Sequence, residues 1–93
     1  MIRSFGDERT KAAFNGQAQK GFPAVLLSVV RRKLRYLNAA ARLSDLMVPP
    51  ANRLEALKGD RRGQHSIRIN DQFRVCFVWT DQGPADVEIV DYH

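Results

Sequence analysis

Cysteine is almost absent from this 93-residue sequence, and its scarcity excludes several classes of protein. The single residue Cys76 leaves no partner for an internal disulfide, which is typical of a reducing compartment such as the cytoplasm. With one cysteine and two separated histidines, the ligands of a zinc site are missing. No carboxylate cluster has the spacing of metal ligands, so we expect neither a metal nor another cofactor.

Long apolar runs are absent too. No stretch approaches the roughly 20 apolar residues that cross a bilayer, and the opening MIRSFGDERT lacks the apolar centre of a signal peptide. The chain also has no internal repeat and no linker. The sequence therefore predicts one domain over residues 1–93, located in the cytoplasm and without membrane contact.

Acidic residues are few relative to basic ones. Ten Asp and Glu stand against 15 Lys and Arg, which gives a formal net charge of +5. Such an excess on a small domain suggests a polyanionic partner, with nucleic acid the first candidate. A basic protein with no such partner is the alternative.

Two helices are predicted in the first half of the chain. GDERTKAAFNG indicates a short helix with Asp7 as its N-cap and an end at Asn15–Gly16. The stretch 22–43 indicates a long amphipathic helix. Its apolar stripe consists of Leu27, Val30, Leu34, Leu37 and Ala41, and its basic stripe contains Arg31, Arg35, Asn38 and Arg42.

The remaining segments read as strands, because apolar residues alternate there with a period of two. The predicted strands are 2–5, 53–59, 65–69, 73–79 and 86–93. Helices grouped before a run of adjacent strands favour an α+β fold. We therefore expect an N-terminal strand and two helices packed on one face of a small, mainly antiparallel sheet.

The parity of two strands places two arginines opposite each other. Ile67 and Ile69 alternate with polar residues in HSIRI, and Phe73 and Val75 continue the odd-numbered apolar set in FRVCFVW. Both sets face one core only if the loop 70–72 has three residues and Ile69 pairs with Phe73. This register sets Arg68 against Arg74 on the face away from the helices.

Like charges directly opposed across a sheet repel each other. An anion between the two guanidinium groups would remove this repulsion, because each offers a planar fork that matches phosphate. Two solvated arginines that splay apart are an equal alternative. If the last strand is regular, Tyr92 lies on the same face. Lys58 lies at the end of the second predicted strand, 53–59, from where it could reach this face.

These residue types suit metal-free cleavage of RNA. The ribose 2′-hydroxyl would attack the adjacent phosphorus, a general base would take its proton, cations would stabilise the phosphate charge, and an acid would protonate the leaving 5′-oxygen. DNA lacks the internal nucleophile. His93 is the best acid or base near neutral pH by residue type.

The segments LKGDRRGQHSIRINDQFRVCFVW and VEIVDYH, with the opening MIRSF and the central basic helix, resemble the HigB branch of the RelE-type toxins. The resemblance implies a RelE-like fold and a ribosome-dependent mRNA endoribonuclease of a bacterial type II toxin–antitoxin system. It implies cleavage in the decoding site and inhibition of translation. By position, it assigns the catalytic site to Lys58, Arg68, Arg74, Asp91, Tyr92 and His93.

The same resemblance implies the partners. They are a HigA-type antitoxin with a helix-turn-helix domain, through which the toxin associates indirectly with DNA, and the ribosome with mRNA in its decoding site. Arg61 and Arg62 of GDRRG, with Arg31 and Arg35 of the long helix, are candidate RNA contacts. A solvated basic surface is the alternative for the helical pair.

Two other functions stay open at the level of sequence. A ParE-like toxin shares the architecture but inhibits DNA gyrase and is no nuclease. A plain RNA-binding module would use the same basic face without turnover. His65, Cys76 and Trp79 are interpreted as structural residues.

Overall fold

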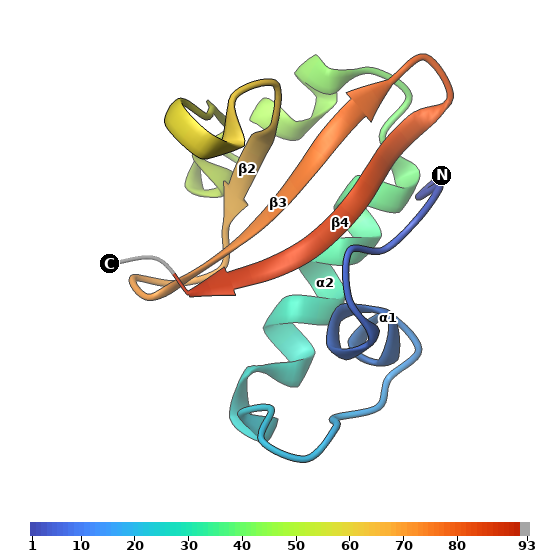
Figure 1. Cartoon of the computed structure of the whole chain (residues 1–93), viewed down its shortest axis with the longest axis vertical. Helices are drawn as coiled ribbons and strands as arrows, with labels where there is room; N and C mark the ends of the chain where they lie inside the picture. Colours follow the sequence, from blue (N-terminus) through green and yellow to red (C-terminus); the bar gives the residue numbers. More distant parts are fainter. Residues whose placement is uncertain (92–93) are drawn as a thin grey trace.

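The structure, a computed structural model, describes residues 1–91 as two α-helices and a four-stranded antiparallel sheet in the order β1-β2-β3-β4 (Figure 1). The helices are α1 Glu8–Phe14 and α2 Leu27–Ala39, and the strands are β1 Glu55–Ala56, β2 His65–Arg68, β3 Phe73–Thr80 and β4 Gly83–Asp91. Four short 3₁₀ turns connect them: η1 Ala24–Leu26, η2 Leu43–Met47, η3 Pro50–Asn52 and η4 Gly59–Arg61. The predicted α+β class is confirmed.

The core lies between α2 and the sheet. Val30, Leu34 and Leu37 of α2 are fully buried, as their spacing of three and four predicts. They belong to one cluster with the inward side chains of the strands, among them Ile67, Val75, Phe77, Val87 and Ile89. The alternation of the predicted strands therefore selects the buried face correctly.

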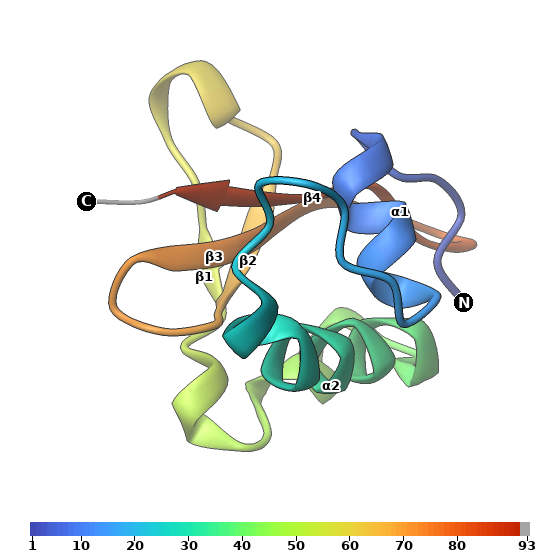
Figure 2. The same ribbon diagram turned by 90° about the horizontal axis from the view of Figure 1, so that it is seen from below.

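The sheet separates α2 from the segment that contains η4. Figure 2 shows α2 against one face of the sheet and the yellow segment around η4 on the opposite side. We call the face away from α2 the outer face; it carries the even-numbered side chains Ser66, Arg68, Arg74, Cys76, Glu88 and Val90. This face holds Arg68 and Arg74 of the predicted site, whereas Asp91 pairs with Phe73 and has the parity of the inward side chains.

The long helix ends earlier than predicted. Ala40 is extended (φ −66°, ψ 127°), so Ala41 and Arg42 lie outside α2, and Ala41 is exposed. The cause is the Asp45 carboxylate, which accepts from the amides of Ala41 and Arg42 at 2.9 and 3.0 Å. These bonds begin the separate turn η2.

Two predicted strands are reduced. The segment 2–5 makes only one parallel bridge, between Phe5 and Val87, although its backbone follows the outer edge of β4 with bonds from Arg3 to Pro84 and from Gly6 to Val87. The predicted strand 53–59 shrinks to two residues. Arg53 is left-handed (φ 46°) at its start, and η4 begins at Gly59.

The last strand is irregular in its middle. Its register against β3 shifts between Cys76 and Val78, so that Asp86 and Val87 stand where β3 has Phe77 alone. Asp86 takes a positive φ of 51° at this bulge. The extra residue keeps Val87 and Ile89 in the core and Glu88 on the outer face.

No helix within residues 1–91 has the length and hydropathy that a bilayer crossing requires.

Candidate functional site

The predicted hairpin register is confirmed. Arg68 pairs with Arg74 across β2 and β3, and the Ile69 amide donates to the Phe73 carbonyl at 3.0 Å. The Asn70 carboxamide oxygen accepts from the amides of Gln72 and Phe73 at 2.8 and 2.7 Å, which closes the three-residue loop. The loop chemistry thus brings the two arginines to one place on the outer face.

Arg74 is held in one orientation although it is charged and only 9% exposed. Its Nε donates to the Ser66 hydroxyl at 2.7 Å, and one terminal nitrogen donates to the Arg53 carbonyl at 2.7 Å. The other terminal nitrogen lies 3.8 Å from the Glu55 carboxylate. A buried guanidinium needs such partners, and they leave it little rotational freedom.

Arg68 has a different partner. It forms an ion pair with Asp71, a fully exposed residue of the hairpin loop. The opposed arginines are therefore each matched to a separate carboxylate, Asp71 for Arg68 and Glu55 for Arg74. The expected repulsion is relieved within the chain itself, without an external anion.

A hollow of about 170 Å³ lies between these groups. Its lining residues are Arg53, Arg68, Asn70, Asp71 and Arg74. Three of the five are arginines, so the hollow is suited to an anion. Since exposed ion pairs contribute only about 0–1 kcal/mol, a phosphate could replace Asp71 at Arg68 at small cost.

Lys58 and Arg62 border another hollow, of about 370 Å³, together with Leu57 and Gly59. Lys58 is exposed and is the N-cap residue of η4. Among the described residues, then, Arg68 and Arg74 line one hollow, whereas Lys58 lines a separate one.

The end of β4 approaches the hairpin loop. Asp91 pairs with Phe73 in the ladder and accepts from the Gln72 carboxamide at 3.2 Å. Val90 lies opposite Arg74, so β4 runs alongside the arginines. Tyr92 and His93 lie outside the described residues. The predicted place of Tyr92 on the outer face and the assignment of His93 to the site therefore stay predictions.

The family model for the RelE-like toxin HigB of type II toxin–antitoxin systems matches residues 3–93. The chain belongs to the HigB-like toxin family. The match covers both the hairpin with its arginines and the strand that follows it.

The chain is similar in sequence to several known proteins. It is 46% identical over 59 residues to "Toxin HigB-1" of Vibrio cholerae serotype O1. The aligned part covers 63% of this chain and 62% of that protein. It is 37% identical over 64 residues to an uncharacterized protein of Haemophilus influenzae. That aligned part covers 69% of this chain and 63% of the other protein. The chain thus covers less than two thirds of these two relatives.

A third relative aligns from end to end. "Endoribonuclease HigB" of Proteus vulgaris is 28% identical over all 93 residues, with 100% of both chains covered. Among solved structures, a chain of the "YoeB-YefM complex from Staphylococcus aureus" matches with a TM-score of 0.63 and 15% identity, over 100% of this chain and 98% of the other. At this low identity the likeness supports the fold alone.

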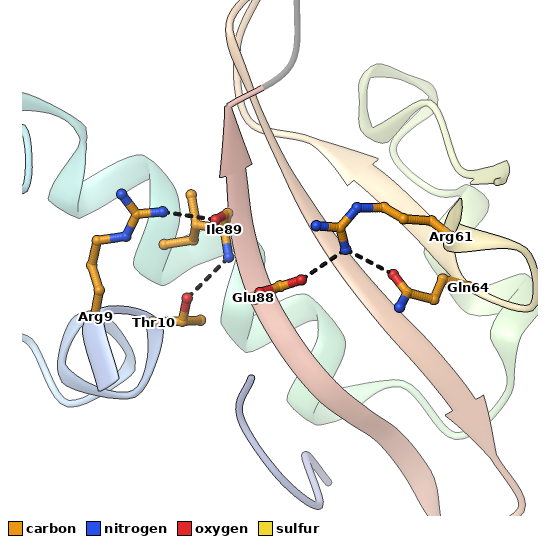
Figure 3. A network of polar contacts seen from close by, with 6 residues as sticks. All are labelled: Arg9, Thr10, Arg61, Gln64, Glu88 and Ile89. Carbon is orange, nitrogen blue, oxygen red and sulfur yellow. Dashed lines mark hydrogen bonds and ion pairs between the residues drawn. The ribbon is translucent and has the colours of Figure 1, made fainter. Parts of the chain in front are cut away.

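The other predicted RNA contacts differ in exposure. Arg61 is paired with Glu88 at 2.7 Å and with Gln64 at 3.1 Å (Figure 3). Arg31 is half-buried and packs against Gly16, where an added Cβ would lie 3.2 Å from its guanidinium carbon. Arg35 and Arg62 are exposed. The basic side of α2 is therefore not uniformly open to a partner.

Sequence reasoning missed the residues that orient Arg74. Ser66 shares the even parity of Arg74, so the alternation of β2 contained its signal. Arg53 contributes a backbone carbonyl, and its left-handed backbone leaves no signature in an isolated sequence. Glu55 is an exposed strand residue whose partner depends on the strand order.

Lys33 was missed as well. Its ammonium donates to the Asn52 side-chain oxygen at 2.6 Å, although the residue is only 5% exposed. Burial lowers the pKa of Lys33, and the charges of Arg32 and Arg68 lower it further. Helical periodicity places Lys33 beside buried Val30 and Leu34, but it cannot identify Asn52 as the partner.

Cys76 is a structural residue, as expected. It is fully buried in β3, and burial raises the pKa of its thiol, which keeps it protonated and unreactive. Trp79 is partly buried and packs against the core.

Within residues 1–91, no three side chains that could hold a metal ion lie together.

Proposed function

We propose that this HigB-like toxin is a metal-independent endoribonuclease that cuts mRNA in the decoding site of the ribosome and so inhibits translation. The observation that carries the proposal is Arg74, a guanidinium in fixed orientation that lines an arginine-rich hollow opposite Arg68. The full-length relative named as an endoribonuclease supports the same class of activity.

The chemistry requires charge stabilisation at phosphorus. As the 2′-hydroxyl attacks, negative charge gathers on the non-bridging oxygens, and Arg74 and Arg68 donate to them from one side of the hollow. Preoriented donors of this kind are each worth about 10²–10³ in rate. Lys58, which lines a separate hollow, adds positive charge.

Proton transfer is assigned to the end of the chain. His93 takes or gives the proton at the 2′- and 5′-oxygens, Tyr92 stacks on a base or exchanges a proton, and Asp91 orients its neighbours. Asp91 is suited to this role because β4 brings it beside the hairpin loop.

The ribosome supplies what a small toxin lacks. Correct placement of the reacting groups can be worth about 7–11 kcal/mol of barrier, and the described hollows offer little surface with which to hold RNA. We therefore place the protein, as one domain, in the cytoplasm with the translating ribosome. Its other partner is a HigA-type antitoxin, through which it associates indirectly with DNA.

The experiment compares cleavage of one mRNA on translating ribosomes and in free solution, read by primer extension. The wild type should cut only the ribosome-bound mRNA, and a 2′-deoxy substitution at the scissile nucleotide should abolish the cut. His93→Gln and Arg74→Lys should both lose activity. Equal rates with and without ribosomes, or cleavage of the deoxy substrate, would contradict the proposal, and DNA breaks without RNA cuts would indicate a gyrase inhibitor.

A further inference from the structure

The segment 58–64 lies over the outer face of the sheet, and a long-range ion pair joins it to that face. Arg61 reaches across β3 to the Glu88 carboxylate on β4 at 2.7 Å, and the same nitrogen donates to Gln64 of its own segment at 3.1 Å (Figure 3). The two ion-pair side chains are 33% and 29% exposed, so the pair is partly shielded from solvent.

The segment begins and ends its excursion at glycines. Gly59 and Gly63 have φ values of 65° and 93°, which other residues rarely adopt. Within residues 1–91, nothing apart from the adjacent residues of the chain lies within 4 Å of an added Cβ at either position. Packing therefore does not fix the segment at these points. Lys58 and Arg62, which line the second hollow, lie on the segment beside them.

Glu88 is by contrast on a strand that is firmly held. The next residue, Ile89, donates from its amide to the buried Thr10 hydroxyl at 2.9 Å and accepts from Arg9 at 2.8 Å (Figure 3). Gly6 packs directly on Glu88, since a Cβ there would lie 3.1 Å from the Glu88 Cβ. Glu88 is thus the fixed partner, and segment 58–64 is the part that the ion pair places.

The ion pair also connects the two parts of the candidate site. Glu88 lies opposite Cys76 on the face that carries Arg74, and β4 continues from Glu88 to Asp91. The charge of Arg61 also lowers the pKa of the Cys76 thiol, against the larger raising effect of burial. The pair therefore links the segment that carries Lys58 to the strand that leads to Asp91.

We infer that Arg61 is a positioning residue, which through Glu88 fixes Lys58 and Arg62 relative to Arg74, and that this role, not contact with RNA phosphate, is its contribution. The inference rests on the proposed nuclease function. It replaces the simpler expectation from sequence that Arg61 binds RNA as an exposed cation.

The test is a charge exchange between the two partners. Single-turnover cleavage of ribosome-bound mRNA is measured for Arg61→Glu, Glu88→Arg and the double exchange. Each single change should lower the maximal rate by roughly tenfold or more, because misplacement by about 1 Å can cost up to 10² in rate. The double exchange should restore the rate to within a few-fold of the wild type.

An RNA contact would give the opposite pattern. A glutamate at position 61 would repel phosphate whatever stands at 88, so the double exchange would stay as slow as Arg61→Glu, with the loss in KM. Arg62→Glu is the matched control, being the same charge reversal one residue along the segment. Glu88→Arg should not rescue it.

Hydrogen exchange provides a readout that does not depend on activity. The Arg62 and Gln64 amides, which donate to Gly59 and Arg61, should exchange faster in each single variant and recover in the double exchange. If a charge reversal fails to fold, Glu88→Gln and Arg61→Gln break the pair more mildly. Unchanged exchange and unchanged rate in these two variants would overturn the inference.

The outcomes separate the inference from the proposed function. If the wild type does not cut ribosome-bound mRNA, the function fails. If the wild type cuts but the double exchange does not recover, the positioning role fails and the nuclease stands.

Discussion

Arg68 and Arg74 lie directly opposite each other across an antiparallel pair, yet their guanidinium groups differ in environment. Arg74 is 9% exposed and bonded to Ser66 and the Arg53 carbonyl, whereas Arg68 is paired with an exposed loop carboxylate. One arginine is thus held firmly in place, and the other has a partner that can be exchanged. This difference predicts different effects when each partner is removed.

Arg74→Lys should reduce cleavage by about 100-fold or more, because one ammonium cannot reproduce the planar fork. Ser66→Ala should reduce cleavage less. It should cost about 1–3 kcal/mol of unfolding free energy, since it leaves a buried N–H without its acceptor. Cleavage assays paired with urea unfolding measure both effects. If Arg74→Lys cuts as fast as the wild type, the guanidinium geometry is irrelevant to the reaction.

Asp71→Asn should strengthen substrate binding. The carboxylate competes with phosphate for Arg68, so its removal should lower KM while leaving kcat and stability nearly unchanged, within about 1 kcal/mol for an exposed pair. Asp81→Asn is the matched control, because Asp81 is an exposed carboxylate in the turn between β3 and β4 and the net charge changes equally. An equal fall in KM for both variants would reduce the effect to net charge.

The pairing of these arginines could be predicted from sequence because it depends on local rules. The alternation of Ile67, Ile69 and Phe73 requires a particular parity, and the loop 70–72 has the length that supplies it. The same reasoning located α2, whose apolar stripe is buried at Val30, Leu34 and Leu37 but not at Ala41, which lies beyond the end of the helix.

Other features depended on contacts between distant residues. Asp45 ends α2 by capping Ala41 and Arg42, and Arg53 becomes left-handed where its carbonyl meets Arg74. Glu88, the carboxylate that pairs with Arg61, is 27 residues away in the chain. No local propensity contains such information, since each side chain would serve equally well with another neighbour.

Lys33 should make stability depend on pH in the alkaline range. Because its folded-state pKa is lowered from 10.5 by burial, the unfolded chain binds more protons between the folded value and 10.5. The contribution of Lys33 to the free energy of unfolding therefore rises as pH increases through that interval. Below the folded pKa the full penalty of the buried charge is present.

Lys33→Met should remove this rise. Urea unfolding of both proteins between about pH 7 and about pH 10 gives the difference between their free energies of unfolding at each pH. The contribution of Cys76 cancels in this difference. Cys76 acts in the opposite direction, since its raised pKa lowers stability as pH increases, but it is common to both proteins. Parallel pH profiles for wild type and Lys33→Met would show that the buried ammonium does not titrate in this range.

The bulge at Asp86 should determine which side chains of β4 reach the outer face. Without the extra residue, the pairing of Val78 with Ala85 would continue so that Glu88 stood opposite Val75, on the buried face. Asp86 occupies φ 51°, and its amide donates to the Ser4 hydroxyl at 2.8 Å. Aspartate tolerates this left-handed conformation, whereas a β-branched residue does not.

Asp86→Val should therefore cost about 1–2 kcal/mol of unfolding free energy, while Asp86→Gly should cost little because glycine accepts positive φ. Both variants remove the same carboxylate, so the difference between them reports the backbone alone. Hydrogen exchange at the Ile89 amide, which donates to Thr10, should quicken in the valine variant as the strand beyond the bulge loosens. If the Asp86→Val and Asp86→Gly variants are equally stable, the positive φ of Asp86 does not determine the register that places Glu88 beside Arg61.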